Sequence, residues 1–202
     1  MSEAELLGRA RAIAGLSLGQ LADLVDVPVP RDSRDAKGFG GQLVERALGG
    51  SAGNLSEPDF QALGIELKTV PIDSKGAPAE ATFVVTLDPR ELITERFEQS
   101  RVLHKLRHVL FIPIEGQRSL IPAIRRIGSP VLYSPTKPHL EKLSRDYEDL
   151  ARRCLLEGPE GLDGELGEWL CVRPKSAKGD AFYLRPKLTA LILGTTLFDL
   201  PA

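Results

Sequence analysis

The sequence PDFQALGIELK, residues 58–68, decides how this chain is interpreted. In its second half, charged Glu66 and Lys68 alternate with apolar neighbours, which is the period-2 pattern of a half-buried strand. Side chains of a strand alternate between its two faces, so Glu66 and Lys68 project from the same face. Asp59, preceded by a proline, stands at the entrance to this strand. We therefore predict a strand over 64–71 with a charged site on one face.

These three side chains form a set that could cleave a phosphodiester. Mg²⁺ prefers oxygen ligands and keeps several waters, so two carboxylates and one backbone carbonyl would be enough to bind it. The cation would stabilise developing charge, and a lysine can position or help deprotonate the attacking water. The alternative is an ordinary strand with a Glu66–Lys68 pair contributing roughly 0.2–1 kcal/mol. Acid-x-Lys triplets also occur at 35–37 and 73–75, but in polar loops.

Hydrophobic spacing along the rest of the chain predicts interleaved helices and strands. Helical spacing covers 3–14, 17–25, 37–48, 91–106 and 136–157, with a closing helix near the end. Strand patterns cover 64–71, 80–87, 108–116 and 130–133, followed by two short strands within 168–175 and 181–187. Ser17 and Gln20 indicate a capping box. We expect the first two strands to form a hairpin, and loops at 28–36 and 49–59. The fold class is α/β (α+β) with a central mixed sheet flanked by helices.

Composition and charge narrow the classes of protein. A chain of 202 residues and 22.0 kDa fits one domain, or two small lobes sharing a core. The net charge of −2 argues by itself against a nucleic-acid partner. However, residues 1–100 carry 10 basic and 16 acidic side chains, whereas residues 101–202 carry 16 and 12, so the halves have net charges of −6 and +4. Such asymmetry is typical of a protein with one surface facing a polyanion.

The N-terminal stretch, the apolar runs and the cysteine count predict the cellular compartment. The N-terminal stretch has acids where a secretion signal has basic residues, and no apolar run reaches the ~18 residues that cross a bilayer. Two cysteines are too few to staple a domain of this size, so we expect both to be reduced. We therefore expect a cytoplasmic protein with no membrane segment.

The motif Pro58-Asp59…Glu66-x-Lys68 resembles that of the PD-(D/E)xK restriction-endonuclease-like superfamily. Longer stretches, among them DAKGFGGQLVERALGGSAGN, HKLRHVLFIPIEGQRS, VRPKS and FYLR, are similar to the MutH family of methyl-directed mismatch-repair endonucleases. The resemblance implies a restriction-endonuclease-like core with two lobes around a DNA cleft. It implies one domain over 1–202, with the catalytic lobe mainly from the first half and the DNA-reading lobe mainly from the second.

The resemblance also implies roles for the residues of the motif. Asp59 and Glu66 would be the Mg²⁺ ligands, together with the backbone carbonyl of Leu67. Lys68 would be the catalytic lysine.

Three residues outside the motif would complete this centre. Glu45 would add a carboxylate to the metal site, although by itself it is typical of a solvated helix position. Lys37 would contact DNA phosphates and Lys105 would belong to the catalytic set, although each alone is typical of a surface lysine.

A second matching region, Arg173-Pro174-Lys175 together with Tyr183, would read the tetranucleotide GATC. Arginine and lysine can donate to O6 and N7 of guanine in the major groove. Tyr183 would lie near the adenine amino group, where a methyl group would bar cleavage. Strand alternation predicts that Tyr183 points outward between two buried neighbours. The connection from Lys175 to Tyr183 is shorter than expected for some relatives.

Two clusters of basic residues accompany these sites. Each alone is typical of a solvated face, but beside a nuclease site we expect phosphate contacts and steep salt dependence of binding. The clusters are Arg101, Lys105, Arg107, Arg118, Arg125 and Arg126, and Arg173, Lys175, Lys178, Arg185 and Lys187.

Our hypothesis is a monomeric, Mg²⁺-dependent endonuclease that nicks the unmethylated strand of hemimethylated GATC sites in double-stranded DNA. The resemblance implies stimulation by MutL. Two alternatives remain open: a GATC-specific restriction endonuclease that cuts both strands, and a non-catalytic DNA-binding module of the same fold.

Overall fold

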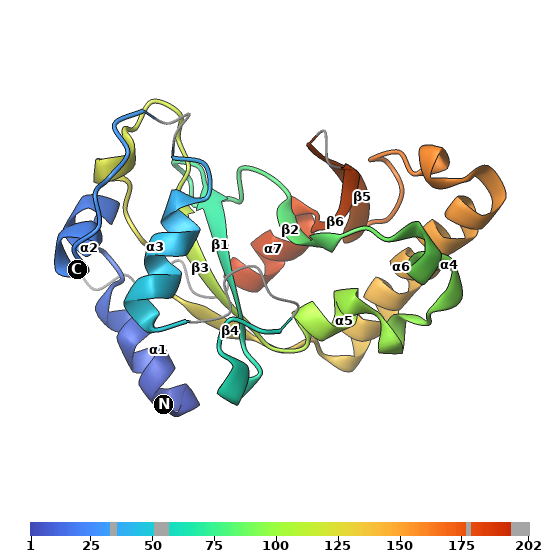
Figure 1. The fold of residues 1–202 in the computed structure, drawn as a ribbon, viewed down its shortest axis with the longest axis horizontal. Coiled ribbons are helices and arrows are strands. Elements are labelled where there is room, and N and C mark those ends of the chain that lie inside the picture. Colours follow the sequence, from blue (N-terminus) through green and yellow to red (C-terminus); the bar gives the residue numbers. More distant parts are fainter. Residues whose placement is uncertain (33–35, 51–56, 177–178, 195–202) are drawn as a thin grey trace. The chain divides into compact units, whose positions relative to one another are not determined.

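The computed structural model describes residues 1–32, 36–50, 57–176 and 179–194. The two predicted loops therefore lie partly outside the described residues, at 33–35 and 51–56, as does Lys178 of the second basic cluster. The described residues form two compact units, whose elements are labelled in Figure 1. Of the described residues, unit 1 contains those within Met1–Glu80, His108–Tyr133 and 190–194, and unit 2 contains those within Ala81–Arg107 and Ser134–Thr189.

Unit 1 is built on a mixed three-stranded sheet in the order β1-β3-β4. Its strands are β1 (Glu66–Ile72), β3 (Val109–Glu115) and β4 (Val131–Tyr133). β1 runs parallel to β3, with Glu66 opposite Val109, and β4 runs antiparallel to β3. Every residue of β3 except the last is buried, as expected for the central strand of a covered sheet. The predicted mixed sheet is confirmed.

Helices of unit 1 flank this sheet, with α3 packed against β1 (Figure 1). They are α1 (Glu3–Ala12), α2 (Leu18–Leu24) and α3 (Phe39–Leu48). Short 3-10 turns precede β1, at Gln61–Leu63, and lie between β3 and β4, at Pro122–Ile124. The predicted capping box is confirmed: Ser17 Oγ accepts the Gln20 N–H at 3.2 Å, and Gln20 Oε1 accepts the Ser17 N–H at 2.9 Å. Gly49, with φ of +83°, ends α3 in the left-handed conformation that glycine adopts readily.

Unit 2 contains a second sheet, antiparallel throughout, in the order β2-β6-β5. Its strands are β2 (Thr82–Thr86), β5 (Leu170–Ser176) and β6 (Gly179–Leu184). Its helical elements are α4 (Pro89–Thr94), Phe97–Gln99, α5 (Arg101–Leu106), α6 (Lys137–Glu157) and Pro159–Gly161, and α7 (Pro186–Leu193) follows β6. The Tyr147 ring of α6 stacks on Phe182 of β6 with centroids 5.9 Å apart, which joins helix and sheet. Cys154 and Cys171 are buried and free.

Two predictions of local structure are wrong. The strands over 64–71 and 80–87 do not pair with each other, because β1 joins the sheet of unit 1 and β2 joins β6 in unit 2. The helix predicted over 91–106 is interrupted, because Asp88 and Ser100 each accept backbone N–H groups and begin separate helices, α4 and α5. Among the described residues, no helix has the length and apolar character needed to span a bilayer.

Candidate active site

The turn before β1 brings Asp59 back to the strand that carries Glu66. Phe60 and Ile65 exchange backbone hydrogen bonds, and a 3-10 turn fills the space between them. Gly64 closes this turn with φ of +64°, a conformation that favours glycine. As a result Asp59 Oδ2 accepts the Leu67 N–H at 2.7 Å. The six-residue spacing of the motif is therefore the length of one closed turn.

Glu66 and Lys68 share a face of β1, as the alternation predicted. The Lys68 ammonium donates to Glu66 Oε1 at 2.8 Å, and both side chains are about nine-tenths buried. Asp59 is buried to the same extent, with 9% of its surface exposed. Buried charges interact more strongly than exposed ones because less water screens them. The structure thus gathers two carboxylates and an ammonium at the start of β1.

Burial raises the pKa of the Asp59 carboxyl from its ordinary value of 3.8 to about 6. The hydrogen bond from the Leu67 N–H opposes this shift. The negative charges of Glu66 and Glu45 raise the pKa of Asp59 as well, whereas the positive charge of Lys68 lowers it. Ionised Asp59 therefore stands in a buried, predominantly negative environment, where a cation would be attracted.

Replacing Asp59 with asparagine is expected to stabilise the metal-free protein by about 2 kcal/mol at pH 8. The raised pKa means that the folded state favours protonated Asp59, so stability is lost as the pH rises from about 4 through about 6. An amide avoids that loss and keeps an oxygen for the Leu67 N–H. Urea unfolding measures this gain in the free energy of unfolding, which should vanish below pH 4. As a control, Asp23→Asn at an exposed position should change stability little at pH 8 or below pH 4. A gain that does not depend on pH would contradict this account.

The donors at this site fit a hard divalent cation. A cation between the carboxylates of Asp59 and Glu66 would relieve the repulsion that raises the pKa of Asp59. Within the part of the chain that the structure describes, no group of three or more His, Cys, Asp or Glu side chains is arranged to hold a metal ion. Mg²⁺ usually retains several waters and needs only one or two protein carboxylates, so the set of Asp59, Glu66 and the Leu67 carbonyl suits it.

The three residues that would complete the centre are distributed differently. Glu45 lies on α3, which packs against β1, close enough for its charge to act on Asp59. Lys37 is exposed in the turn that precedes α3. Lys105 lies in unit 2, on α5, and is buried, with 9% of its surface exposed. The catalytic and DNA-binding roles of these residues stay predictions.

The predicted DNA-reading residues are neighbours in the sheet of unit 2. Arg173, Pro174 and Lys175 follow one another on β5, and Tyr183 lies on adjacent β6. The pairing register shifts between Pro174 and Ser176, so Lys175 sits at an irregularity of the ladder. Such irregularities redirect side chains and are common beside functional sites. Tyr183 is half-buried between two buried neighbours on β6, which confirms the predicted alternation.

Phe83 is a member of this group that sequence reasoning missed. It pairs with Tyr183 across β2 and β6, and the two rings meet edge to face with centroids 5.8 Å apart. The Lys175 ammonium lies over the Phe83 ring, 4.4 Å from its centroid, and donates to Thr86 Oγ1 at 3.4 Å. The available signal was a large aromatic ring on the less buried face of the strand predicted over 80–87.

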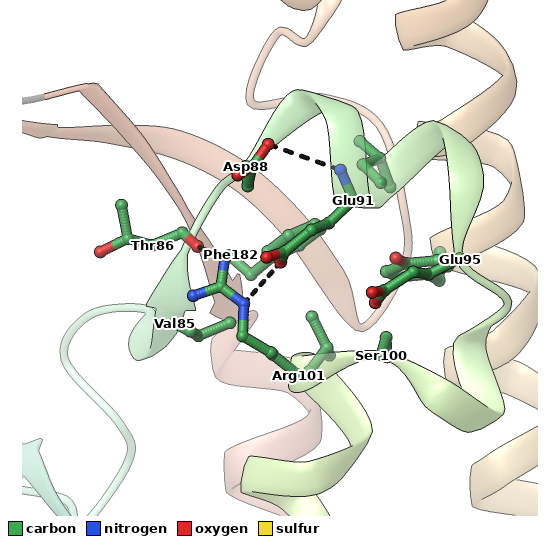
Figure 2. A pocket seen from close by; sticks show the side chains of 11 residues that line it. Val85, Thr86, Asp88, Glu91, Glu95, Ser100, Arg101 and Phe182 are labelled. Carbon is green, nitrogen blue, oxygen red and sulfur yellow. Dashed lines mark hydrogen bonds and ion pairs between the residues drawn. The ribbon is translucent and has the colours of Figure 1, made fainter. Parts of the chain in front are cut away.

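Arg101, a member of the first basic cluster, lines a small pocket in unit 2 (Figure 2). The carboxylate of Glu91 lies beside the guanidinium of Arg101 in this pocket, and Glu95 also lines it. Arg101 Nε donates to Glu91 Oε2 at 2.5 Å, and its Nη2 donates to the Thr86 carbonyl at 3.4 Å. The positive charge of Arg101 is therefore balanced within unit 2. Arg101 is a weaker candidate for a phosphate contact than its place in the predicted basic cluster indicated.

A mixed sheet flanked by helices, with two carboxylates and a lysine at the start of β1, defines a protein of the restriction-endonuclease-like class. A family model described as the DNA mismatch repair enzyme MutH matches residues 48–146. The DNA mismatch repair protein MutH of Klebsiella pneumoniae is 42% identical over 210 residues, which cover 95% of this chain and 91% of that protein. The chain belongs to the MutH family.

Two further relatives support this assignment. The DNA mismatch repair protein MutH of Pasteurella multocida is 41% identical over 95% of each chain. That of Citrobacter koseri is 43% identical over 99% of this chain and 85% of its own length. The similarity therefore extends well beyond the motif at the start of β1.

Proposed function

We propose that this protein is an endonuclease that nicks the unmethylated strand at hemimethylated GATC sites during DNA mismatch repair, with Mg²⁺ as cofactor. The observation that carries the proposal is the buried set of Asp59, Glu66 and Lys68 at the start of β1. Family membership supports it, because the relatives are DNA mismatch repair proteins by name. We include MutL as the activator that links cutting to mismatch recognition.

The proposed mechanism assigns each side chain of the site a task. A Mg²⁺ ion held by Asp59, Glu66 and the Leu67 carbonyl would supply positive charge for the developing phosphorane and lower the pKa of water. The buried ammonium of Lys68 carries three N–H donors, which can orient the attacking water or stabilise a phosphate oxygen. Glu66 holds that ammonium in one position before DNA arrives. The site is therefore preorganised on a strand rather than on a loop.

Base reading is assigned to the sheet of unit 2. Arg173 and Lys175 would donate to guanine O6 and N7, and Tyr183 would sense the methyl group on adenine. Phe83 supports this group through its contacts with Lys175 and Tyr183. In this proposal the two units are the catalytic and DNA-reading lobes of one monomeric cytoplasmic enzyme. Lys37 and Glu45 would complete the contacts of the catalytic lobe with phosphate and metal, and Lys105 of unit 2 would belong to the catalytic set.

The proposal is tested with supercoiled plasmid DNA carrying unmethylated, hemimethylated or fully methylated GATC sites. With Mg²⁺ and MutL we expect nicked product from the first two substrates and none from the third, and EDTA should stop the reaction. The nick on hemimethylated DNA should map to the unmethylated strand. A plasmid without GATC is the matched substrate control.

Other outcomes of this assay identify the alternatives. Linear product from single binding events would instead indicate a restriction endonuclease that cuts both strands. Absence of any product, with MutL present or omitted, would reject the endonuclease and leave a DNA-binding module. Cleavage of fully methylated DNA would reject the methyl-sensing role given to Tyr183.

A further inference from the structure

Arg185 follows β6 directly and directs its side chain into the loop that leads to β5. Its Nε donates to the Gly167 carbonyl at 2.7 Å, and its Nη2 donates to the carbonyls of Gly164 and Leu166 at 2.6 and 3.0 Å. Its backbone N–H donates to the Trp169 carbonyl at 2.8 Å. One residue thus binds four carbonyls of the segment 164–169, which we call the buttress loop.

The buttress loop is fixed from its other side by α6. Asp146 of α6 accepts the backbone N–H groups of Glu168, Trp169 and Leu170 at 3.0, 2.7 and 2.9 Å. Gly167 passes so close that an added Cβ would lie 1.8 Å from the Leu170 carbonyl oxygen, and its φ is +78°. Carbonyls held by a guanidinium and amides held by a carboxylate leave this segment little freedom.

The buttress loop passes beside a proposed base-reading residue. A Cβ built on Gly164 would lie 3.7 Å from both Cγ and Nε of Arg173, which is ordinary van der Waals contact. The carbonyl of the same Gly164 is the one that Arg185 binds at 2.6 Å. Arg185 therefore holds the backbone at Gly164, and Gly164 is a close neighbour of the Arg173 side chain.

We infer that Arg185 is a positioning residue, which holds the buttress loop against Arg173 and so fixes the guanidinium that reads guanine. This inference rests on the proposed function, in which Arg173 contacts the GATC site. It differs from the expectation that Arg185 contacts phosphate, because the structure directs Arg185 toward backbone carbonyls. A fixed arginine loses less conformational entropy when it meets a base, so site preference depends on the loop.

The test compares Arg185→Met with the wild type on two oligonucleotide duplexes, one with GATC and one in which its guanine pair is replaced. Mispositioning a recognition group is expected to raise KM for the GATC duplex about 10-fold, with kcat within about 2-fold. Binding to the second duplex and its salt dependence should stay unchanged. Arg185→Lys should restore part of the preference, and Arg152→Met, which removes an exposed charge of α6, should have no effect.

A double-mutant cycle separates positioning from independent contacts. In an Arg173→Ala background, Arg185→Met should add nothing to the loss of site preference. Additive losses would overturn the inference, as would an unchanged preference in Arg185→Met. Weaker binding to both duplexes, with a salt slope lower by about 1, would show a phosphate contact instead. If Arg185→Met does not fold, Arg185→Lys carries the same cycle. A wild type that does not distinguish the duplexes would reject the proposed function itself.

Discussion

Replacing Lys68 with alanine is expected to reduce strand cleavage by about 1,000-fold or more, while DNA binding changes by less than about 2-fold. Removing the ammonium leaves Glu66 without its 2.8 Å partner and takes away the positive charge that Lys68 would place beside the reacting phosphate. Affinity should persist because most of it comes from phosphate contacts spread over many residues. Nicking of GATC plasmid measures the first effect, and fluorescence anisotropy in EDTA measures the second.

The chain provides its own control for this experiment. Asp73-Ser74-Lys75 is a second acid-x-Lys triplet, but it forms an exposed turn in which Asp73 Oδ1 accepts the N–H groups of Lys75 and Ala77. Lys75→Ala should therefore cleave like the wild type. Equal cleavage by the Lys68 and Lys75 variants would refute the catalytic assignment of Lys68. A parallel loss of DNA binding in Lys68→Ala would move its role from catalysis to binding.

Replacing Asp146 with alanine is expected to lower the free energy of unfolding by about 3–5 kcal/mol. Asp146 is buried, with 6% of its surface exposed, and its carboxylate accepts three successive backbone N–H groups at the start of β5. A buried donor left without an acceptor costs about 1–3 kcal/mol, and here three are left at once. Urea unfolding followed by circular dichroism measures the change. Asp146→Asn keeps one oxygen acceptor and should lie between alanine and the wild type.

Asp149 is the matched control on the same helix. It is exposed and pairs only loosely with Arg152, at 3.4 Å, so Asp149→Ala should change stability by less than about 0.5 kcal/mol. Similar losses in the two variants would show that α6 is simply sensitive to loss of an acid. No loss in Asp146→Ala would mean that water satisfies the exposed amides.

Elements encoded by neighbouring residues could be predicted from the sequence. The capping box at Ser17 acts within one turn of the chain and is confirmed, and the end of the helix predicted over 37–48 coincides with the end of α3. Strand pairing could not be predicted, because the polar turn after β1 specifies a change of direction but not a partner. The break before α5 was readable, since Ser100 is a typical N-cap residue, but the surrounding helical spacing concealed it.

The same division applies to the candidate site. The Asp59, Glu66 and Lys68 set could be predicted because its members lie within one turn and one strand of each other. Phe83, Asp146 and Arg185 could not, because each acts on residues brought near by sheet pairing or helix packing. Sequence spacing therefore predicted which side chains gather at the start of β1, whereas groups that act through long-range contacts became visible only in the structure.

The discontinuous composition of the two units has a consequence for synthesis. The chain passes from one unit to the other at four points, and β1 acquires its parallel neighbour β3 only after the whole of β2, α4 and α5 has been made. A growing chain emerges from its N-terminus, so the strand that carries Lys68 first appears as an unpaired edge. An incomplete polypeptide therefore lacks the sheet that orders the active site. We therefore expect nuclease activity only from a chain that has been synthesised beyond β3.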